Sequence, residues 1–169
     1  MANRVGIALG ANLGDRLAQM KKACTLLAQL SPAGSKLLQA PIYHSEPLDC
    51  PDNSPDFYNT VIEISYGGTP LELLTQTQLI EKHLGRPAIH GHHTPRLIDL
   101  DILYFGNETL QTEKLTLPHP RMTERSFVLQ PLAHMRPDLI LPHDHLTVAD
   151  HWRQLDSVEP ALRIAHLNW

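Results

Sequence analysis

Two aspartates, Asp99 and Asp101, are separated by one residue within the apolar stretch 97–105. In a β-strand, residues i and i+2 point to the same face, so the two carboxylates would project together while the flanking apolar residues face a core. Two strand steps place the carboxylates roughly 6.6 Å apart along the backbone. That spacing suits a pair of divalent cations about 3.5–4 Å apart, as used for in-line displacement at phosphorus. The alternative is an edge strand whose polar face meets solvent.

Basic side chains lie in or beside the irregular segments on both sides of this pair: Arg86, Arg96, Arg121 and Arg125. Arginine suits bidentate contacts with phosphate oxygens, although each of these residues alone could be a solvated surface charge. His119 lies between two prolines, which indicates a rigid presentation toward a ligand phosphate or, alternatively, an ordinary stiff turn.

Other nucleotide and metal signatures are weak. The sequence contains neither G-x-x-x-x-G-K-[ST] nor G-x-G-x-x-G, and the glycine turn at 10–14 is most simply a strand-to-helix connection. The histidines His90, His92 and His93 lack a cysteine partner at zinc-site spacing, so we expect them to contact ligand or solvent.

Composition limits the class of protein. The chain has 169 residues, 42% of them hydrophobic and 19% charged, which predicts a single globular domain over 1–169. A net charge of −4 argues against nucleic-acid and membrane partners. No apolar stretch approaches the ~20 residues that span a bilayer. We therefore expect a cytoplasmic protein that acts on small molecules. A monomer is a separate expectation that these patterns do not determine.

Hydrophobic periodicity and turn residues predict the order β-α-β-β-α-β. Thr69, Pro70 and Glu72 form a capping box before the second helix, and Gly85 follows its end. The order resembles a ferredoxin-like α+β sandwich, an antiparallel sheet with helices on one face and long active-site loops. The expected strands span 4–9, 36–43, 58–66, 98–105 and 109–116; the expected helices span 15–30, 69–84, 125–132 and 147–155.

A resemblance to a known family rests on two motifs and on the distance between them along the chain. The motifs are Arg96-x-x-Asp99-Leu-Asp101 and Leu117-Pro-His119-Pro-Arg121-Met. The chain resembles the 6-hydroxymethyl-7,8-dihydropterin pyrophosphokinases of folate biosynthesis nearly from end to end. The resemblance implies Mg²⁺-dependent transfer of pyrophosphate from ATP to the hydroxymethyl group of the pterin, giving the pterin diphosphate and AMP.

The resemblance also implies site residues. Asp99 and Asp101 would hold two Mg²⁺ ions, and Arg86 and Arg96 would assist the transfer. The residues implied for the nucleotide are Glu81, Leu97, Ile98, Ile102, His119 and Arg125. The residues implied for the pterin are Asn12, Ser45, Leu48, Phe57, Asn59 and Phe127.

The segment 86–95 departs from the family pattern, because Ala88, His92 and His93 stand where the family offers arginines and an aromatic residue. A protonated His92 could replace an arginine charge, which would make activity depend on pH. The departure leaves open a binding or regulatory module that has lost transferase activity. A ferredoxin-like RNA-binding module is the other rival, but the sequence lacks the basic, aromatic-rich strand typical of one.

Overall fold

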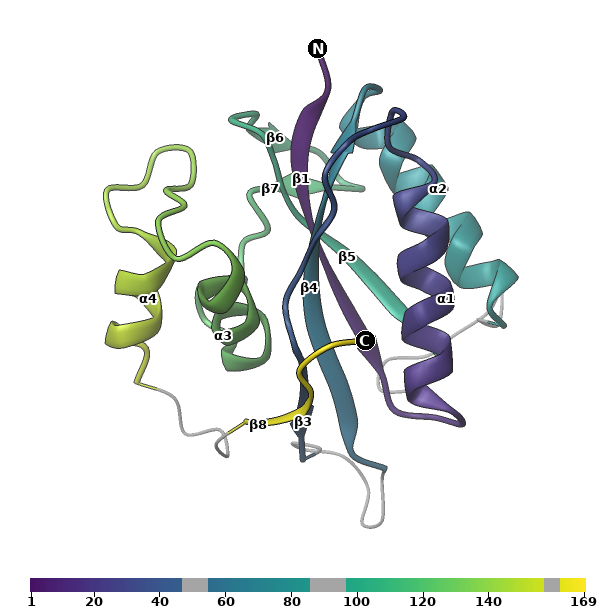
Figure 1. Cartoon of the computed structure of the whole chain (residues 1–169). Coiled ribbons are helices and arrows are strands. Elements are labelled where there is room, and N and C mark those ends of the chain that lie inside the picture. The colour runs from purple at the N-terminus through teal and green to yellow at the C-terminus, as the bar shows by residue number, and fades with distance from the viewer. Residues whose placement is uncertain (47–54, 86–96, 157–161) are drawn as a thin grey trace.

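The computed structural model describes residues 1–46, 55–85, 97–156 and 162–169. Among these, an antiparallel six-stranded sheet has the order β5(Asp99–Phe105), β1(Asn3–Ala11), β4(Phe57–Tyr66), β3(Ile42–Ser45), β8(Arg163–His166). The short β2(Leu38–Gln39) also pairs with β4 (Figure 1). β1 therefore lies between the strands that carry the predicted metal and pterin residues.

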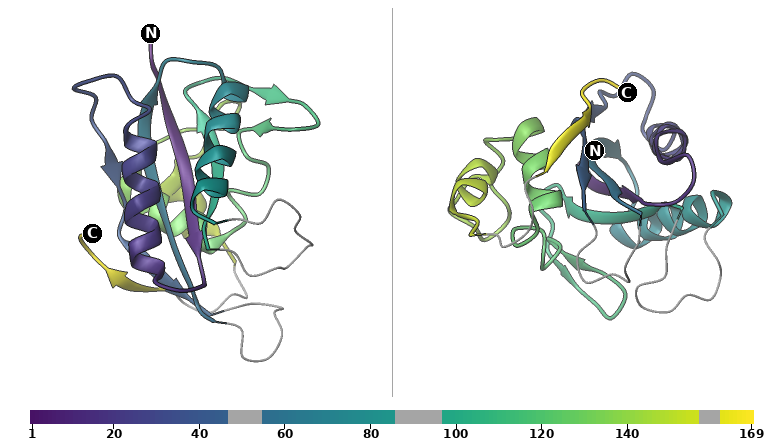
Figure 2. Two further views of the ribbon diagram at one scale, coloured as in Figure 1. Left: turned by 90° about the vertical axis from the view of Figure 1, so that its right-hand side faces the viewer. Right: turned by 90° about the horizontal axis from the view of Figure 1, so that it is seen from below.

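Helices cover both faces of this sheet (Figures 1 and 2). α1(Arg16–Ala28) and α2(Pro70–His83) pack on one face, and α3(Ser126–Met135) and α4(Val148–Gln154) pack on the other, which we call the α3 face. The fold class is confirmed, but the prediction of helices on one face is wrong for the two C-terminal helices. Within the described ranges, no helix has the length and apolar character needed to cross a membrane.

Local signals start and stop α2 as predicted. The Thr69 hydroxyl accepts from the backbone N–H of Glu72, while the Glu72 carboxylate accepts from that of Thr69, so the capping box satisfies two free donors of α2. Gly85 ends the helix at φ +100°, a conformation that favours glycine. Thr147 and Asp150 form a second capping box at α4.

The two faces of β1 differ in side-chain size. Val5, Ile7 and Leu9 are buried against α1 and α2. The alternate residues on the α3 face are Gly6, Ala8 and Gly10. Because these three are small, side chains from the neighbouring strands can approach across β1.

Two strand predictions need correction, and one observed strand was not predicted. The strand expected at 36–43 is two strands, β2 and β3, interrupted at Pro41, whose nitrogen carries no hydrogen for the ladder. The turn at Gly106 is confirmed, but the following residues form β6(Leu110–Gln111) and β7(Thr116–Leu117), which pair with each other in a separate sheet. β8 was not predicted, because it is short and largely exposed and so gives no apolar alternation.

Candidate active site

Strand register brings the predicted metal and pterin residues to one place. Gly10 in β1 pairs with Asn59 of β4 on one side and with Asp99 of β5 on the other. Residues directly opposite in an antiparallel ladder share a face, so Asn59 and Asp99 both lie on the α3 face. Two strand spacings place their backbones about 10 Å apart.

Asp101 pairs with Ala8 and therefore shares this face with Asp99. Ile98, Leu100 and Ile102 are buried in the opposite core, which confirms the predicted alternation. Both aspartates are half-buried. No cluster of three or more metal-ligating side chains occurs in the described part of the chain. A metal here would therefore take its remaining ligands from a substrate, from water or from residues outside that part.

The pterin residues predicted on β3 and β4 lie next to one another. The side-chain amide of Asn59 donates to the hydroxyl oxygen of Ser45 at 2.8 Å, and Asn59 is buried. A Cβ at Gly10 would lie 3.1 Å from the amide oxygen of Asn59, so glycine leaves room for this side chain. Phe57 pairs with Ser45 and is half-buried on the same face.

The N-terminal end of α3 carries Arg125 and Phe127. Both are half-buried, and the Arg125 guanidinium lies 5.6 Å from the centre of the Phe127 ring. Phe127 packs against the core that includes Val61 of β4, two residues from Asn59. This end of the helix can therefore present a cation and a flat apolar ring together.

His119 lies beside β5, where its backbone N–H donates to the carbonyl of Leu103 at 2.7 Å. Its Nδ1 accepts from the backbone N–H of Arg121 at 3.1 Å, so in the neutral ring the proton is on Nε2. Burial lowers the pKa of His119 below its ordinary value, and the charges of Arg125 and Arg121 lower it further. Near neutral pH the side chain is thus an uncharged N–H donor.

Other residues implied for the nucleotide lie toward α1 and α2. Glu81 is buried and accepts from the backbone N–H of Leu100 at 2.8 Å, which satisfies a donor on the edge strand β5. Ile98 is 0% and Ile102 is 3% exposed. For their side chains to contact adenosine, these two residues would have to be more exposed than they are here. Their role in binding the nucleotide stays a prediction. Leu97 is half-buried and packs near Gly14 and Gly85. Asn12, which was implied for the pterin and not for the nucleotide, is buried just after β1.

Three predicted site residues, Leu48, Arg86 and Arg96, lie outside the described residues. The same holds for the departures Ala88, His92 and His93. Their roles stay predictions.

A buried carboxylate was missed by the sequence analysis. Glu63 of β4 is completely buried and bonds to Arg4, Tyr104 and Arg136. In the alternation of β4, Glu63 shares a face with Asn59 and Val61. Its partners are not visible in a local pattern, because they lie 59, 41 and 73 residues away.

Comparisons with known proteins show the family of this chain. A family model described as 7,8-dihydro-6-hydroxymethylpterin-pyrophosphokinase (HPPK) matches residues 6–137. A Bacillus subtilis protein named 2-amino-4-hydroxy-6-hydroxymethyldihydropteridine pyrophosphokinase is 44% identical over 135 residues, 80% of this chain and 79% of that protein. The Pneumocystis carinii folic acid synthesis protein fol1 is 38% identical over 167 residues, 97% of this chain and 22% of that protein.

Solved structures share the fold. A crystal structure of HPPK-DHPS in complex with substrates superposes with a TM-score of 0.71 at 12% identity, covering 90% of this chain and 43% of that chain. A Plasmodium falciparum HPPK-DHPS variant gives 0.70 at 14% identity and covers 91% of this chain. The chain spans less than half the length of these fused proteins.

An antiparallel sheet with helices on both faces defines an α+β protein, and one face of its sheet holds the carboxylate pair and the buried amide of Asn59 on either side of β1. The chain belongs to the 7,8-dihydro-6-hydroxymethylpterin-pyrophosphokinase family. It is an enzyme of the pyrophosphokinase class, EC 2.7.6.3, in folate biosynthesis.

Proposed function

We propose that the chain transfers pyrophosphate from ATP to 6-hydroxymethyl-7,8-dihydropterin in the presence of Mg²⁺, producing the pterin diphosphate and AMP. The observation that carries the proposal is the shared face of Asp99, Asp101 and Asn59 around β1. In the reaction the pterin hydroxyl oxygen forms a bond to the β-phosphorus of ATP. The bond from that phosphorus to the α,β-bridging oxygen breaks, AMP leaves, and the hydroxyl proton passes to solvent.

The side chains fit Mg²⁺. Asp99 and Asp101 are hard oxygen donors on one strand face, half-buried and so within reach of a ligand. Mg²⁺ is commonly held by one or two carboxylates plus substrate phosphates and water, so a complete protein cage is not required. When bound there, Mg²⁺ supplies neutralisation of the triphosphate charge. We assign two ions to this pair.

The protein's other groups position and stabilise the phosphates. The Nε2–H of neutral His119 donates a hydrogen bond to a phosphate oxygen, and the Arg125 guanidinium adds fixed positive charge at the start of α3. Arg86 and Arg96 assist the transfer, and Glu81, Leu97, Ile98 and Ile102 serve the adenosine side. Phosphoryl-type transfer depends mainly on such positioning, since little covalent chemistry is required of the protein.

The pterin binds next to the carboxylate pair. Phe127 stacks on the pterin ring and Asn59 hydrogen-bonds its polar edge, with Ser45 orienting the Asn59 amide. Phe57, Leu48 and Asn12 complete the pocket. Supporting this assignment, Asn59 lies on the face of the sheet that α3 covers, and its backbone is roughly two strand spacings from that of Asp99.

The remaining expectations stay predictions: one domain over 1–169, a monomer, and a cytoplasmic location. A module that binds these ligands without turnover is the second candidate. It is favoured by the departure of segment 86–95 from the pattern that the resemblance implies, with Ala88, His92 and His93 at the places of arginines and an aromatic residue.

The test mixes the protein with ATP, Mg²⁺ and the pterin alcohol and follows AMP and pterin diphosphate by phosphorus NMR. The proposal predicts both products in equal amounts, and neither product when the pterin or Mg²⁺ is omitted. Binding of both substrates with no AMP would establish the second candidate instead.

A further inference from the structure

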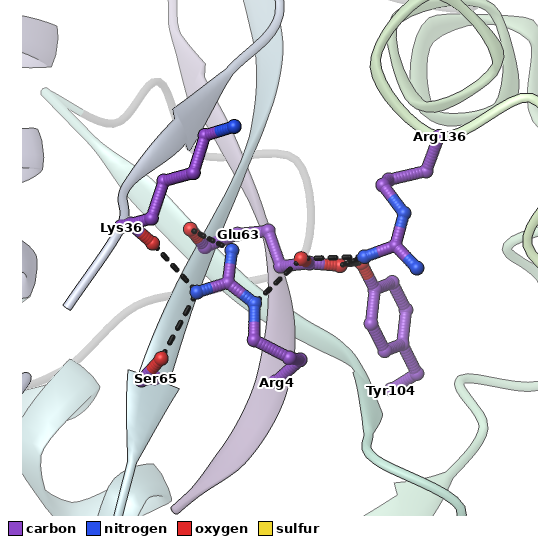
Figure 3. Close-up of polar contacts among 6 residues, drawn as sticks. All are labelled: Arg4, Lys36, Glu63, Ser65, Tyr104 and Arg136. Carbon is purple, nitrogen blue, oxygen red and sulfur yellow. Dashed lines mark hydrogen bonds and ion pairs between the residues drawn. The ribbon is translucent and has the colours of Figure 1, made fainter.

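Glu63 is a buried ionisable group that the proposed chemistry does not use. Its carboxylate accepts from Arg4 Nε at 2.8 Å, from Arg136 Nη1 at 2.6 Å and from the Tyr104 hydroxyl (Figure 3). A carboxylate removed from water is costly unless charged and polar partners satisfy its oxygens. We call these four residues the Glu63 cluster.

Tyr104 reaches Glu63 by crossing β1. Gly6 pairs with Glu63 on one side and with Tyr104 on the other, and a Cβ at Gly6 would lie 2.2 Å from the Tyr104 ring. A register shift between Gly6 and Ile7 turns both Leu103 and Tyr104 toward α3. Burial raises the pKa of Tyr104, and the Glu63 charge adds to this effect, so the hydroxyl keeps its proton and donates.

The Glu63 cluster connects β4, β5 and α3, and each of these elements carries residues of the candidate site farther along its length. Glu63 is four residues from Asn59 on β4, and Tyr104 is three residues from Asp101 on β5. Arg136 ends α3, the helix that begins with Phe127 in its first turn. A change in how Arg136 meets Glu63 would therefore tilt α3 relative to both strands.

The contacts that hold α3 against the sheet differ in how directional they are. Within the helix, Pro131 has no N–H to donate to the carbonyl of Phe127. Apolar packing against Val61 and Leu103 is non-directional. By contrast, Arg136 Nη1 lies within 2.6 Å of both Glu63 oxygens, and charge-assisted hydrogen bonds are directional.

We propose that Glu63, Tyr104 and Arg136 are positioning residues that set the tilt of α3. The tilt in turn holds the Phe127 ring at the position from which it and Asn59 can contact the pterin together. The inference rests on the proposed function. Among the described residues assigned to ATP, Arg125 alone lies at α3. Asp99 and Asp101 lie on β5 and His119 lies beside it, so ATP affinity is less sensitive to this tilt than pterin affinity. The Glu63 cluster therefore acts mainly on pterin affinity. A merely structural cluster would affect both substrates equally or neither.

The test compares Arg136→Met and Tyr104→Phe with the parent, since Glu63→Gln leaves two arginines facing a neutral group and can fail to fold. The matched control is Arg153→Met, which removes an exposed arginine of α4 paired with Asp150. Calorimetry measures binding of the pterin alcohol and, separately, of a non-hydrolysable ATP analogue with Mg²⁺. Hydrogen exchange is followed over residues 126–135 without ligand.

The proposal predicts that Arg136→Met weakens pterin binding about tenfold, leaves binding of the ATP analogue within about twofold, and speeds exchange in α3. Arg136→Lys should restore part of the pterin affinity because it restores the charge. Equal loss of both affinities, or unchanged pterin affinity, overturns the proposal. If the parent itself binds no pterin, the proposed function fails, and exchange alone then decides: faster exchange in Arg136→Met supports the anchoring of α3, and unchanged exchange overturns it.

Discussion

Replacing Gly6 with alanine tests the packing of Tyr104 across β1. An alanine Cβ at this position would lie 2.2 Å from Tyr104 Cε1 and 2.6 Å from Cζ. Real Cβ atoms do not approach carbon so closely, so the tyrosine ring must move. Because the ring lies between Gly6 and α3 and its hydroxyl donates to Glu63, the movement disturbs the core and removes a buried hydrogen bond.

Three contributions set the magnitude. A glycine within a strand is less favourable than alanine by roughly 0.5–1 kcal/mol, so without a contact Gly6→Ala would stabilise the protein. Overpacking costs about 1–3 kcal/mol, and the lost hydrogen bond to a charged acceptor costs about 1.5–3 kcal/mol. The net expectation is a loss of about 2–5 kcal/mol in the free energy of unfolding, against a total of about 5–15 kcal/mol for a typical domain.

Urea denaturation of the parent and Gly6→Ala measures this difference. Gly67→Ala is the matched control, because a Cβ there meets no atom within 4 Å. The double variant Gly6→Ala/Tyr104→Leu should be less destabilised than the sum of the single variants, since the smaller side chain vacates the space. If Gly6→Ala proves as stable as Gly67→Ala, the reasoning about Tyr104 is wrong.

Further predictions concern the site and the helix ends. Phe127→Ala should weaken pterin binding about threefold to tenfold in calorimetry, because stacking contributes about 0.5–1.5 kcal/mol beyond burial, while an equal loss of ATP affinity would contradict the assignment. The lowered pKa of His119 means that the unfolded chain binds its proton more readily, so stability falls as pH drops through about 6.5. Urea curves at several pH values should show a smaller acid-induced loss for His119→Asn, and parallel losses would refute this. Thr69→Ala should cost about 0.5–2 kcal/mol through the lost cap of α2, and an unchanged melting temperature would argue against the capping box.

Much of the central sheet could be predicted because its signals are local. The alternation around Asp99 and Asp101 indicated both the strand and its buried face, and Thr69 with Glu72 fixed the start of α2. Such patterns depend on neighbours two to four residues apart, which a single sequence displays directly.

What could not be predicted depends on distant contacts. The positions of α3 and α4 on the second face follow from side chains such as Val61 and Leu103, which look like ordinary strand residues in the sequence. The approach of Asn59 to Asp99 depends on the register of both strands with β1. The small residues Gly6 and Gly10 were visible, but their role in admitting Tyr104 and Asn59 depends on that same register.

The central claim is that Asp99 and Asp101 bind the metal-bound polyphosphate on the α3 face. Its most direct test is the turnover of Asp101→Asn in the AMP assay, with Asp138→Asn, an exposed aspartate after α3, as the control. The account predicts that Asp101→Asn loses turnover by orders of magnitude while the protein stays folded. Near-parent turnover of Asp101→Asn would contradict it.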